Sequence, residues 1–134
     1  MVNCSWIFFS ASLISGMAAH NDTGKEGEAL AIAFFRERDY LILHTNWRWR
    51  HLEIDLVATK GNYLHFIEVK TRTSEKFGKP EAGVSRKKLR NLQDAAAAYL
   101  HTYPTKKRVQ FDVLSILISP AGPNFTLIED HYVW

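Results

Sequence analysis

Residues 53–70, EIDLVATKGNYLHFIEVK, decide the fold because they hold two β-rich runs that a Gly-Asn pair separates. Both runs are rich in β-branched and aromatic residues, and glycine supplies the positive φ that the first position of a tight turn requires. We therefore predict a β-hairpin whose two-residue loop is Gly61-Asn62. Lys60 then pairs with Tyr63, and the numbers of all paired residues sum to 123.

The predicted hairpin carries four charged side chains on one face, because side chains alternate along a strand. Asp55 lies opposite Glu68 in this register. Glu53 lies opposite Lys70. The other face is apolar and is predicted to belong to the core, with Ile54, Leu56, Ala58, Ile67 and Val69.

The two opposed carboxylates indicate a need for positive charge. Directly opposed Cβ atoms lie about 5 Å apart, a separation at which like charges destabilise a sheet. Such carboxylates share a proton or need a cation between them, and Lys70 also has Glu53 opposite it. Mg²⁺ takes oxygen ligands, usually with only one or two protein carboxylates. A metal site is one interpretation of this face, and a solvated face that tolerates the repulsion is the other.

The whole chain predicts an α/β fold with a central mixed β-sheet flanked by helices, in the order αβββαββ. Asn21-Asp22-Thr23 can cap a first helix that runs to about Arg38. The other predicted elements are a strand over Tyr40–Asn46, the hairpin, a loop over 72–84, a helix from the Ser85 cap to Tyr103, and strands over Lys107–Ser119 and Phe125–Val133. The turn PAGPN separates the last two strands.

The first helix has a carboxylate among its apolar side chains. On a helical wheel one apolar arc is formed by Leu30, Ala31, Ile32, Phe34 and Phe35. Glu28 falls inside this arc. Because an unpaired buried charge is very costly, Glu28 is expected either to have a partner or to reach water at the edge of the arc.

The bulk properties favour a small reduced protein. The 134 residues suit one domain with a hydrophobic core, and the single cysteine, Cys4, leaves no internal disulfide, which favours a cytoplasmic setting. The six histidines have no ligand-like spacing, so a zinc site is not expected. Residues 1–16 are apolar but too short to span a bilayer, and no other segment could cross a membrane. We expect residues 1–16 to be an extension, disordered or added by an upstream start, and residues 17–134 to form a single domain.

The charge is distributed unevenly. Residues 70–108 hold eleven Lys or Arg against three acidic residues, a net charge of +8, while the rest of the chain holds six against eleven, a net charge of −5. This asymmetry indicates a basic patch for a polyanion beside an acidic pocket, although a solvated basic helix would have the same composition.

Several motifs occur in a familiar order. GKEGEA in the first helix, followed by NWR, EID, EVKTR and FDV, resembles the YraN-like family of small bacterial proteins. That family is similar in turn to archaeal Holliday junction resolvases and to the restriction-endonuclease-like PD-(D/E)xK superfamily. The resemblance covers residues 17–134 and implies a restriction-endonuclease-like fold with metal-dependent endonuclease activity on DNA, branched or structured DNA included. Leu52 departs from the pattern, since family members usually have glycine before E-I-D, and this puts the loop after Trp49 in doubt.

The resemblance implies roles for the residues already singled out. Asp55 and Glu68 would bind Mg²⁺ or Mn²⁺, and Lys70 would position or help to deprotonate a water. Glu28 would be a further catalytic, metal-binding acid. DNA would be contacted by Arg48, Arg72, Lys76, Lys79, Arg86, Lys87, Lys88 and Arg90. Asp112, the aspartate of FDV, gains no clear role from the resemblance, and Trp47 and Trp49 could either stack on unpaired bases or pack at the core and its rim.

Two alternatives to a self-sufficient nuclease stay open. The chain could be a non-catalytic nucleic-acid-binding module that keeps the fold and the basic patch. It could also be a subunit that becomes competent only as a homodimer or with another partner. The intact Lys70 and the opposed carboxylates favour the nuclease, because binding a polyanion does not require clustered acids.

Overall fold

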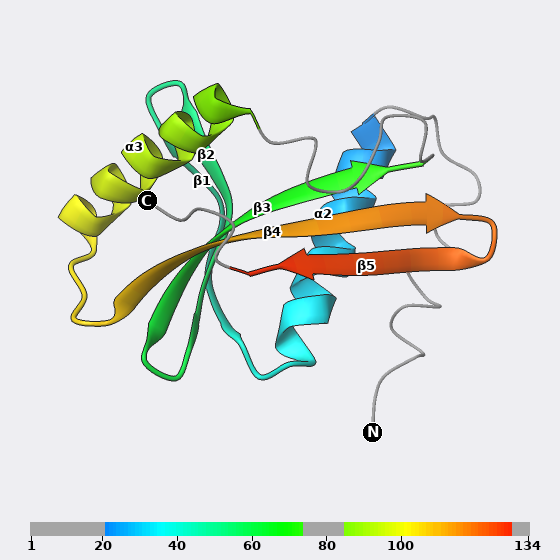
Figure 1. Ribbon diagram of the computed structural model, residues 1–134, viewed down its shortest axis with the longest axis horizontal. Coiled ribbons are helices and arrows are strands. Elements are labelled where there is room, and N and C mark those ends of the chain that lie inside the picture. Colours follow the sequence, from blue (N-terminus) through cyan, green and yellow to red (C-terminus); the bar gives the residue numbers. More distant parts are fainter. Residues whose placement is uncertain (1–20, 74–84, 130–134) are drawn as a thin grey trace.

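The computed structural model describes residues 21–73 and 85–129. Over these residues the elements are, in order, α2 (Asn21–Arg36), β1 (Leu41–Trp49), β2 (Leu52–Lys60), β3 (Tyr63–Arg72), α3 (Arg86–Thr102), β4 (Arg108–Ser119) and β5 (Gly122–Ile128) (Figure 1). The expected N-terminal extension and almost all of the Lys-rich loop lie outside the described residues. Neither α2 nor α3 is long and apolar enough to cross a membrane.

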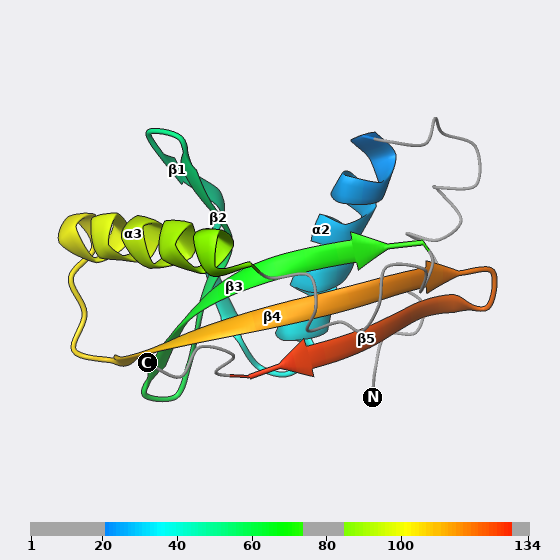
Figure 2. The ribbon, with the colours of Figure 1, turned by 45° about the horizontal axis from the view of Figure 1, so that its top comes forward.

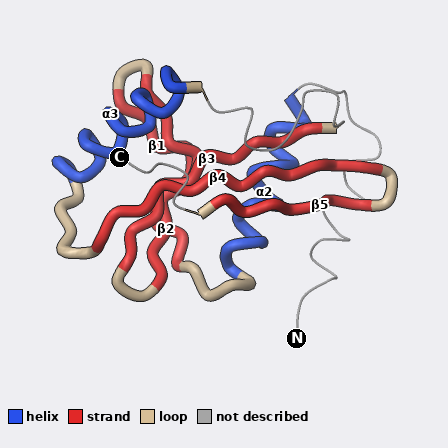
Figure 3. Tube along the Cα trace, in the orientation of Figure 1, coloured by secondary structure: helices blue, strands red, loops and turns tan. Residues whose placement is uncertain are grey.

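The five strands form one mixed sheet in the order β1-β2-β3-β4-β5, which confirms the α/β class. Only β3 and β4 pair in parallel, and the other neighbouring strands are antiparallel. A parallel pair needs a long crossover, and here α3 lies within it. Figure 3 shows β3, β4 and β5 running side by side, while the β1–β2 hairpin bends away from them.

The predicted hairpin register is confirmed. Lys60 pairs with Tyr63 and the ladder continues to the pair Leu56–Ile67, so the paired numbers sum to 123. Gly61 has φ +58°, the left-handed conformation that the turn requires. Local turn chemistry therefore determines the alignment of β2 with β3.

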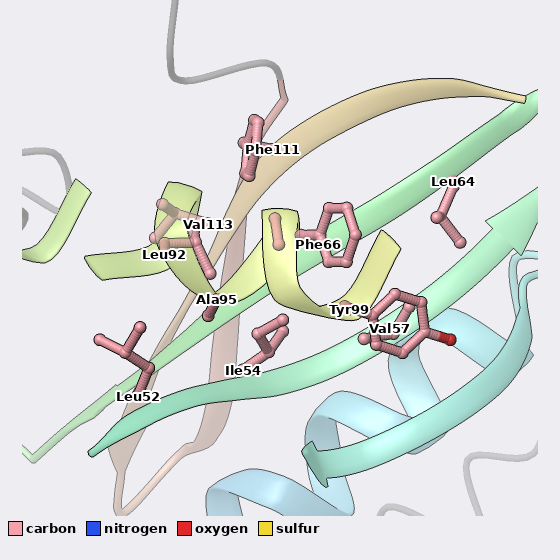
Figure 4. Packing of buried hydrophobic residues seen from close by; sticks show 11 residues of the cluster. Leu52, Ile54, Val57, Leu64, Phe66, Leu92, Ala95, Tyr99, Phe111 and Val113 are labelled. Atoms are coloured by element: carbon pink, nitrogen blue, oxygen red, sulfur yellow. The ribbon is translucent and has the colours of Figure 1, made fainter. Parts of the chain in front are cut away.

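Two hydrophobic clusters cover opposite faces of the sheet. α3 packs on the first cluster through Leu92, Ala95, Ala96 and Tyr99. Figure 4 shows Leu92, Ala95 and Tyr99 near Phe66 and Ile54. α2 packs on the second cluster through Leu30, Ala31, Phe34 and Phe35. The neighbours Phe66 and Ile67 on β3 belong to different clusters, as alternation requires. Figure 2 shows the two helices on either side of the twisted sheet.

β2 does not keep the simple alternation that the sequence predicts. Ile54 belongs to the α3 cluster, Leu56 to the α2 cluster and Val57 again to the α3 cluster. The prediction that Ile54 shares an apolar face with Leu56 is therefore wrong. The irregularity falls at Asp55, directly before the ladder with β3 begins at Leu56.

Several element boundaries also differ from the prediction. β1 continues past Asn46 to Trp49, because its pairing with β2 extends to the pair Trp49–Leu52. β5 begins at Gly122, inside the predicted turn, and a proline at position 123 is tolerated because β5 is an edge strand. The helix cap at Ser85 is confirmed, since its side chain accepts a hydrogen bond from the Lys88 N–H at 3.2 Å.

Candidate functional site

The candidate site lies where β2 separates from β3. The ladder between these strands ends at the pair Leu56–Ile67, whereas β3 stays paired with β4 as far as Arg72. In this opening the Asp55 carboxylate accepts a hydrogen bond from the Val69 backbone N–H at 2.8 Å. Asp55 therefore lies just outside the β2–β3 ladder. Its side chain accepts the hydrogen bond of the Val69 backbone N–H, which has no ladder partner on β2.

The Asp55 carboxylate lacks sufficient positive charge around it. Burial first, then the negative charge of Glu68 and, more weakly, that of Glu53 raise the pKa of Asp55 to about 7. The hydrogen bond from Val69 and the positive charge of Lys88 act in the opposite direction but are weaker than burial. The repulsion expected from the sequence is thus present, and a cation bound between the carboxylates would relieve it.

Two lysines lie beside the two carboxylates. Lys88 Nζ, on the first turn of α3, donates to Glu68 Oε1 at 3.1 Å, and the side chains are 53% and 18% exposed, respectively. Burial, and next the charge of Lys88, lower the pKa of Lys70, while Glu68 raises it. Lys70 is therefore close to both Glu68 and Lys88, and a lowered pKa suits a group that exchanges a proton with water.

Glu28 is held one strand away from Asp55. Its Oε1 accepts a hydrogen bond from Asn46 Nδ2 on β1. Asn46 lies between the paired residues Thr45–Leu56 and Trp47–Ile54, so it stands across from Asp55. Within residues 21–73 and 85–129, no three His, Cys, Asp or Glu side chains gather closely enough to hold a metal ion. The structure thus brings Asp55 and Glu68 together, while Glu28 is bonded to Asn46 on the neighbouring strand β1.

Close packing of α2 on β3 positions Glu28. Gly27 is buried, and a Cβ at this position would lie 1.9 Å from Thr71 Oγ1. Only glycine therefore permits this approach of the helix to the strand. Gly27, Asn46 and Thr71 are not among the predicted site residues, although they lie in the motifs GKEGEA, NWR and EVKTR, respectively.

The tip of the β1–β2 hairpin is basic and aromatic. Glu53, which was expected opposite Lys70, lies 3.6 Å from Arg48 across this hairpin. Trp47 packs edge-on against Tyr99 at 5.2 Å between ring centroids, whereas Trp49 is 38% exposed with the Arg50 guanidinium 4.3 Å from its ring centroid. The two tryptophans therefore differ, and only Trp49 has an open ring surface.

The remaining predicted DNA contacts divide into two groups. Exposed basic side chains in the first turns of α3 are Arg86, Lys87, Lys88 and Arg90. Arg72 is half-buried at the end of β3, while Lys76 and Lys79 lie outside the described residues. A basic surface therefore begins at Lys88 and adjoins the carboxylate pair directly.

Asp112 belongs to the core. Its side chain is fully buried, with Oδ2 2.6 Å from His65 Nδ1 and Oδ1 accepting from Gln110 Nε2 at 2.9 Å. Asp112 is paired with Ile67, on the α2 side of the sheet. These partners give the aspartate of FDV a structural role in joining β3 and β4.

Comparison with known proteins identifies the family. The family described as Uncharacterised protein family UPF0102 matches residues 27–116. A UPF0102 protein of Bacteroides thetaiotaomicron is 41% identical over 115 residues, which cover 86% of this chain and 92% of the relative. The chain belongs to the UPF0102 family. This is the YraN family, so the resemblance inferred from the motifs is confirmed.

Further UPF0102 relatives match over most of their length. The UPF0102 protein of Parabacteroides distasonis is 39% identical over 116 residues, covering 87% of this chain and 96% of the relative. The relative from Syntrophomonas wolfei is 42% identical over 100 residues, covering 74% of the chain and 87% of the relative. UPF0102 membership therefore extends over the strands and helices that carry the carboxylate pair, both lysines and Asn46.

Proposed function

We propose that this UPF0102 protein is a metal-dependent endonuclease with a restriction-endonuclease-like core, acting on DNA in the cytoplasm. The observation that carries the proposal is the pair Asp55 and Glu68, with Lys70 beside Glu68, at the separation of β2 from β3. Burial, and next the negative charge of Glu68, raise the pKa of Asp55 to about 7, which is a cost to folding that a bound cation would reduce. A basic surface next to the pair supplies the attraction for a phosphodiester backbone.

The donor atoms fit Mg²⁺ or Mn²⁺. Asp55 and Glu68 offer hard carboxylate oxygens, and Mg²⁺ commonly uses one or two protein carboxylates and keeps several waters. Such an ion, when bound, acidifies a coordinated water and stabilises charge on phosphate oxygens. Glu28, which hydrogen-bonds to Asn46, would act as an outer partner that orients the site.

Each basic residue has a distinct task in this proposal. Lys70 holds or accepts a proton at the attacking water, and burial, which lowers its pKa, makes its proton easier to give up than that of a solvated lysine. Arg86, Lys87 and Arg90 bind the phosphate backbone without reading sequence. Trp49, exposed at the hairpin tip, offers a surface on which an unpaired base can stack, which favours branched or gapped substrates.

A non-catalytic binding module is the second candidate. The observation in its favour is the Lys88–Glu68 ion pair, which offsets part of the negative charge at the site without any metal. The basic surface would bind nucleic acid in either case.

A cleavage assay on the full chain distinguishes the metal-dependent nuclease from the non-catalytic binding module. Labelled linear, flap and four-way-junction DNA would be incubated with Mg²⁺, Mn²⁺ or EDTA, using wild type, Glu68→Gln, Lys70→Met and a control, Lys106→Met, on an exposed lysine away from the site. We expect cutting with either metal, none with EDTA, and a loss of at least 100-fold in both site variants, on the order of the effect of removing one catalytic group.

The opposite outcome has an equally clear form. DNA retarded on a gel but uncut in both metals by a folded wild-type chain would establish the binding module in place of the nuclease. If both Glu68→Gln and Lys70→Met still cut DNA, the catalytic residues do not lie where β2 and β3 separate.

A further inference from the structure

Lys88 forms an ion pair with Glu68, a carboxylate that would be a ligand in the proposed metal site. Its Nζ lies 3.1 Å from Glu68 Oε1, and Lys88 is also one of the positive charges felt by Asp55 and Lys70. The lysine belongs to α3, twenty residues along the chain from Glu68, so the contact comes from packing of α3 on the sheet. The ion pair therefore substitutes for an external cation.

A divalent cation and the Lys88 ammonium compete for this position. Both groups are positive and the ion carries two charges, so they repel each other when they occupy the same position, and solvent around the half-exposed lysine screens part of that repulsion. The stem of Lys88 is half-exposed and flexible, so the ammonium can swing away from Glu68 without disturbing the core. Once away, it lies on the same exposed helical turns as Arg86, Lys87 and Arg90, where phosphate would bind.

We propose that Lys88 is a positioning residue that alternates between Glu68 in the metal-free protein and a DNA phosphate in the metal-bound protein. Metal binding then frees Lys88 to contact a phosphate, and phosphate binding to Lys88 frees Glu68 to bind the metal. The two ligands assist each other, and linkage requires that the effect be equal in both directions. This inference rests on the proposed metal site and adds the reason why metal and DNA would bind cooperatively.

The test measures metal binding without any turnover. Mn²⁺ alone is titrated calorimetrically into full-length wild type, Lys88→Met, Lys88→Arg and the control Lys106→Met. Lys88→Met keeps the aliphatic stem and removes the competing charge, so we expect Mn²⁺ to bind about two- to fivefold more tightly, the range set by a partly exposed ion pair. Lys88→Arg keeps the charge and should retain the wild-type affinity.

A second readout follows DNA affinity by fluorescence anisotropy, with and without Ca²⁺ as an ion chosen to leave the DNA uncut. The increase in DNA affinity on adding Ca²⁺ should be smaller in Lys88→Met than in wild type. An unchanged or weaker Mn²⁺ affinity in Lys88→Met overturns the inference, as does an equal gain in Lys106→Met, which would be a general charge effect.

Glu68→Gln distinguishes the failure of this inference from the failure of the proposed function. If wild type binds Mn²⁺ and Glu68→Gln does not, the metal site stands whatever Lys88 does. If wild-type binding is absent or indifferent to Glu68→Gln, both the metal site and the role of Lys88 are wrong.

Discussion

At the scale of single residues, Asp55 is the one whose environment opposes its charge most clearly. It is ionised in the unfolded chain above its ordinary pKa of 3.8, but in the folded chain it keeps its proton up to about pH 7. The folded state therefore loses stability as the pH rises from about 4 to about 7, and the loss persists above that range. Asp55 thus destabilises the metal-free protein at physiological pH.

Asp55→Asn should stabilise the metal-free protein at pH 8 by roughly 2–4 kcal/mol and change its stability little at pH 4, because only the ionised carboxylate is penalised. Urea unfolding at both pH values, in EDTA, measures the difference. Mn²⁺ at pH 8 should raise the melting temperature of wild type and not of Asp55→Asn. Asp94→Asn, which removes an exposed carboxylate on α3, is the control and should show no such difference between the two pH values.

Trp47 and Trp49 form a second residue-scale contrast. Trp47→Ala removes an edge-on contact with Tyr99 and should cost about 2–4 kcal/mol of folding stability. Trp49→Ala should cost less than about 1 kcal/mol but weaken binding of gapped DNA by roughly 5- to 100-fold, the range for one stacked base. Anisotropy with gapped and fully paired duplexes measures this. Equal losses for both duplexes would show that Trp49 does not recognise unpaired bases.

At the scale of elements, the contact between α2 and β3 explains why the carboxylate of Glu28 comes so near the site. Gly27 and Thr71 let the helix approach, and Glu28 then reaches Asn46 on β1. Asn46 has φ +50°, a left-handed conformation that asparagine tolerates better than most residues. A helix, two strands and one irregular residue therefore act together to orient this carboxylate.

Gly27→Ala should destabilise the protein by about 1–3 kcal/mol, although alanine normally stabilises a helix, because the new methyl group collides with Thr71. Gly24→Ala, in the same helix with nothing within 4 Å of its Cβ position, is the matched control and should stabilise by about 0.5–1 kcal/mol. Chemical denaturation gives both values. The double variant Gly27→Ala/Thr71→Ala should recover part of the loss, and no recovery would show that the collision is not the cause.

At the scale of the whole molecule, two carboxylates, Asp55 and Glu68, lie where β2 and β3 separate, and the basic first turns of α3 lie beside them. Lys88 joins the two regions through its ion pair with Glu68. A DNA backbone bound along α3 would therefore pass next to the carboxylates. That the chain forms a homodimer stays a prediction.

DNA affinity should fall steeply with salt, since each neutralised phosphate contributes about −0.9 to the slope of log K against log salt. The triple variant Arg86→Ala/Lys87→Ala/Arg90→Ala should reduce the magnitude of that slope by about 2–3 and lower affinity equally for all sequences. Anisotropy titrations at several KCl concentrations measure the slope. If the triple variant has an unchanged slope, the phosphate backbone binds elsewhere on the protein. The variant Lys25→Ala/Lys106→Ala is the control for loss of positive charge.

The sequence by itself determined the β2–β3 register, the cap of α3, the apolar side of α2 and the closeness of two carboxylates, Asp55 and Glu68. These features depend on turn chemistry and periodicity, which act between residues a few positions apart. Only the tertiary structure decided that β2 pairs with β3 from Leu56 onward and not before it, that Ile54 changes face, and that Asp112 is buried with His65. It alone also brings Asn46 to Glu28 and Lys88 to Glu68, because those contacts arise where helices pack against a bent sheet and join residues far apart in the chain.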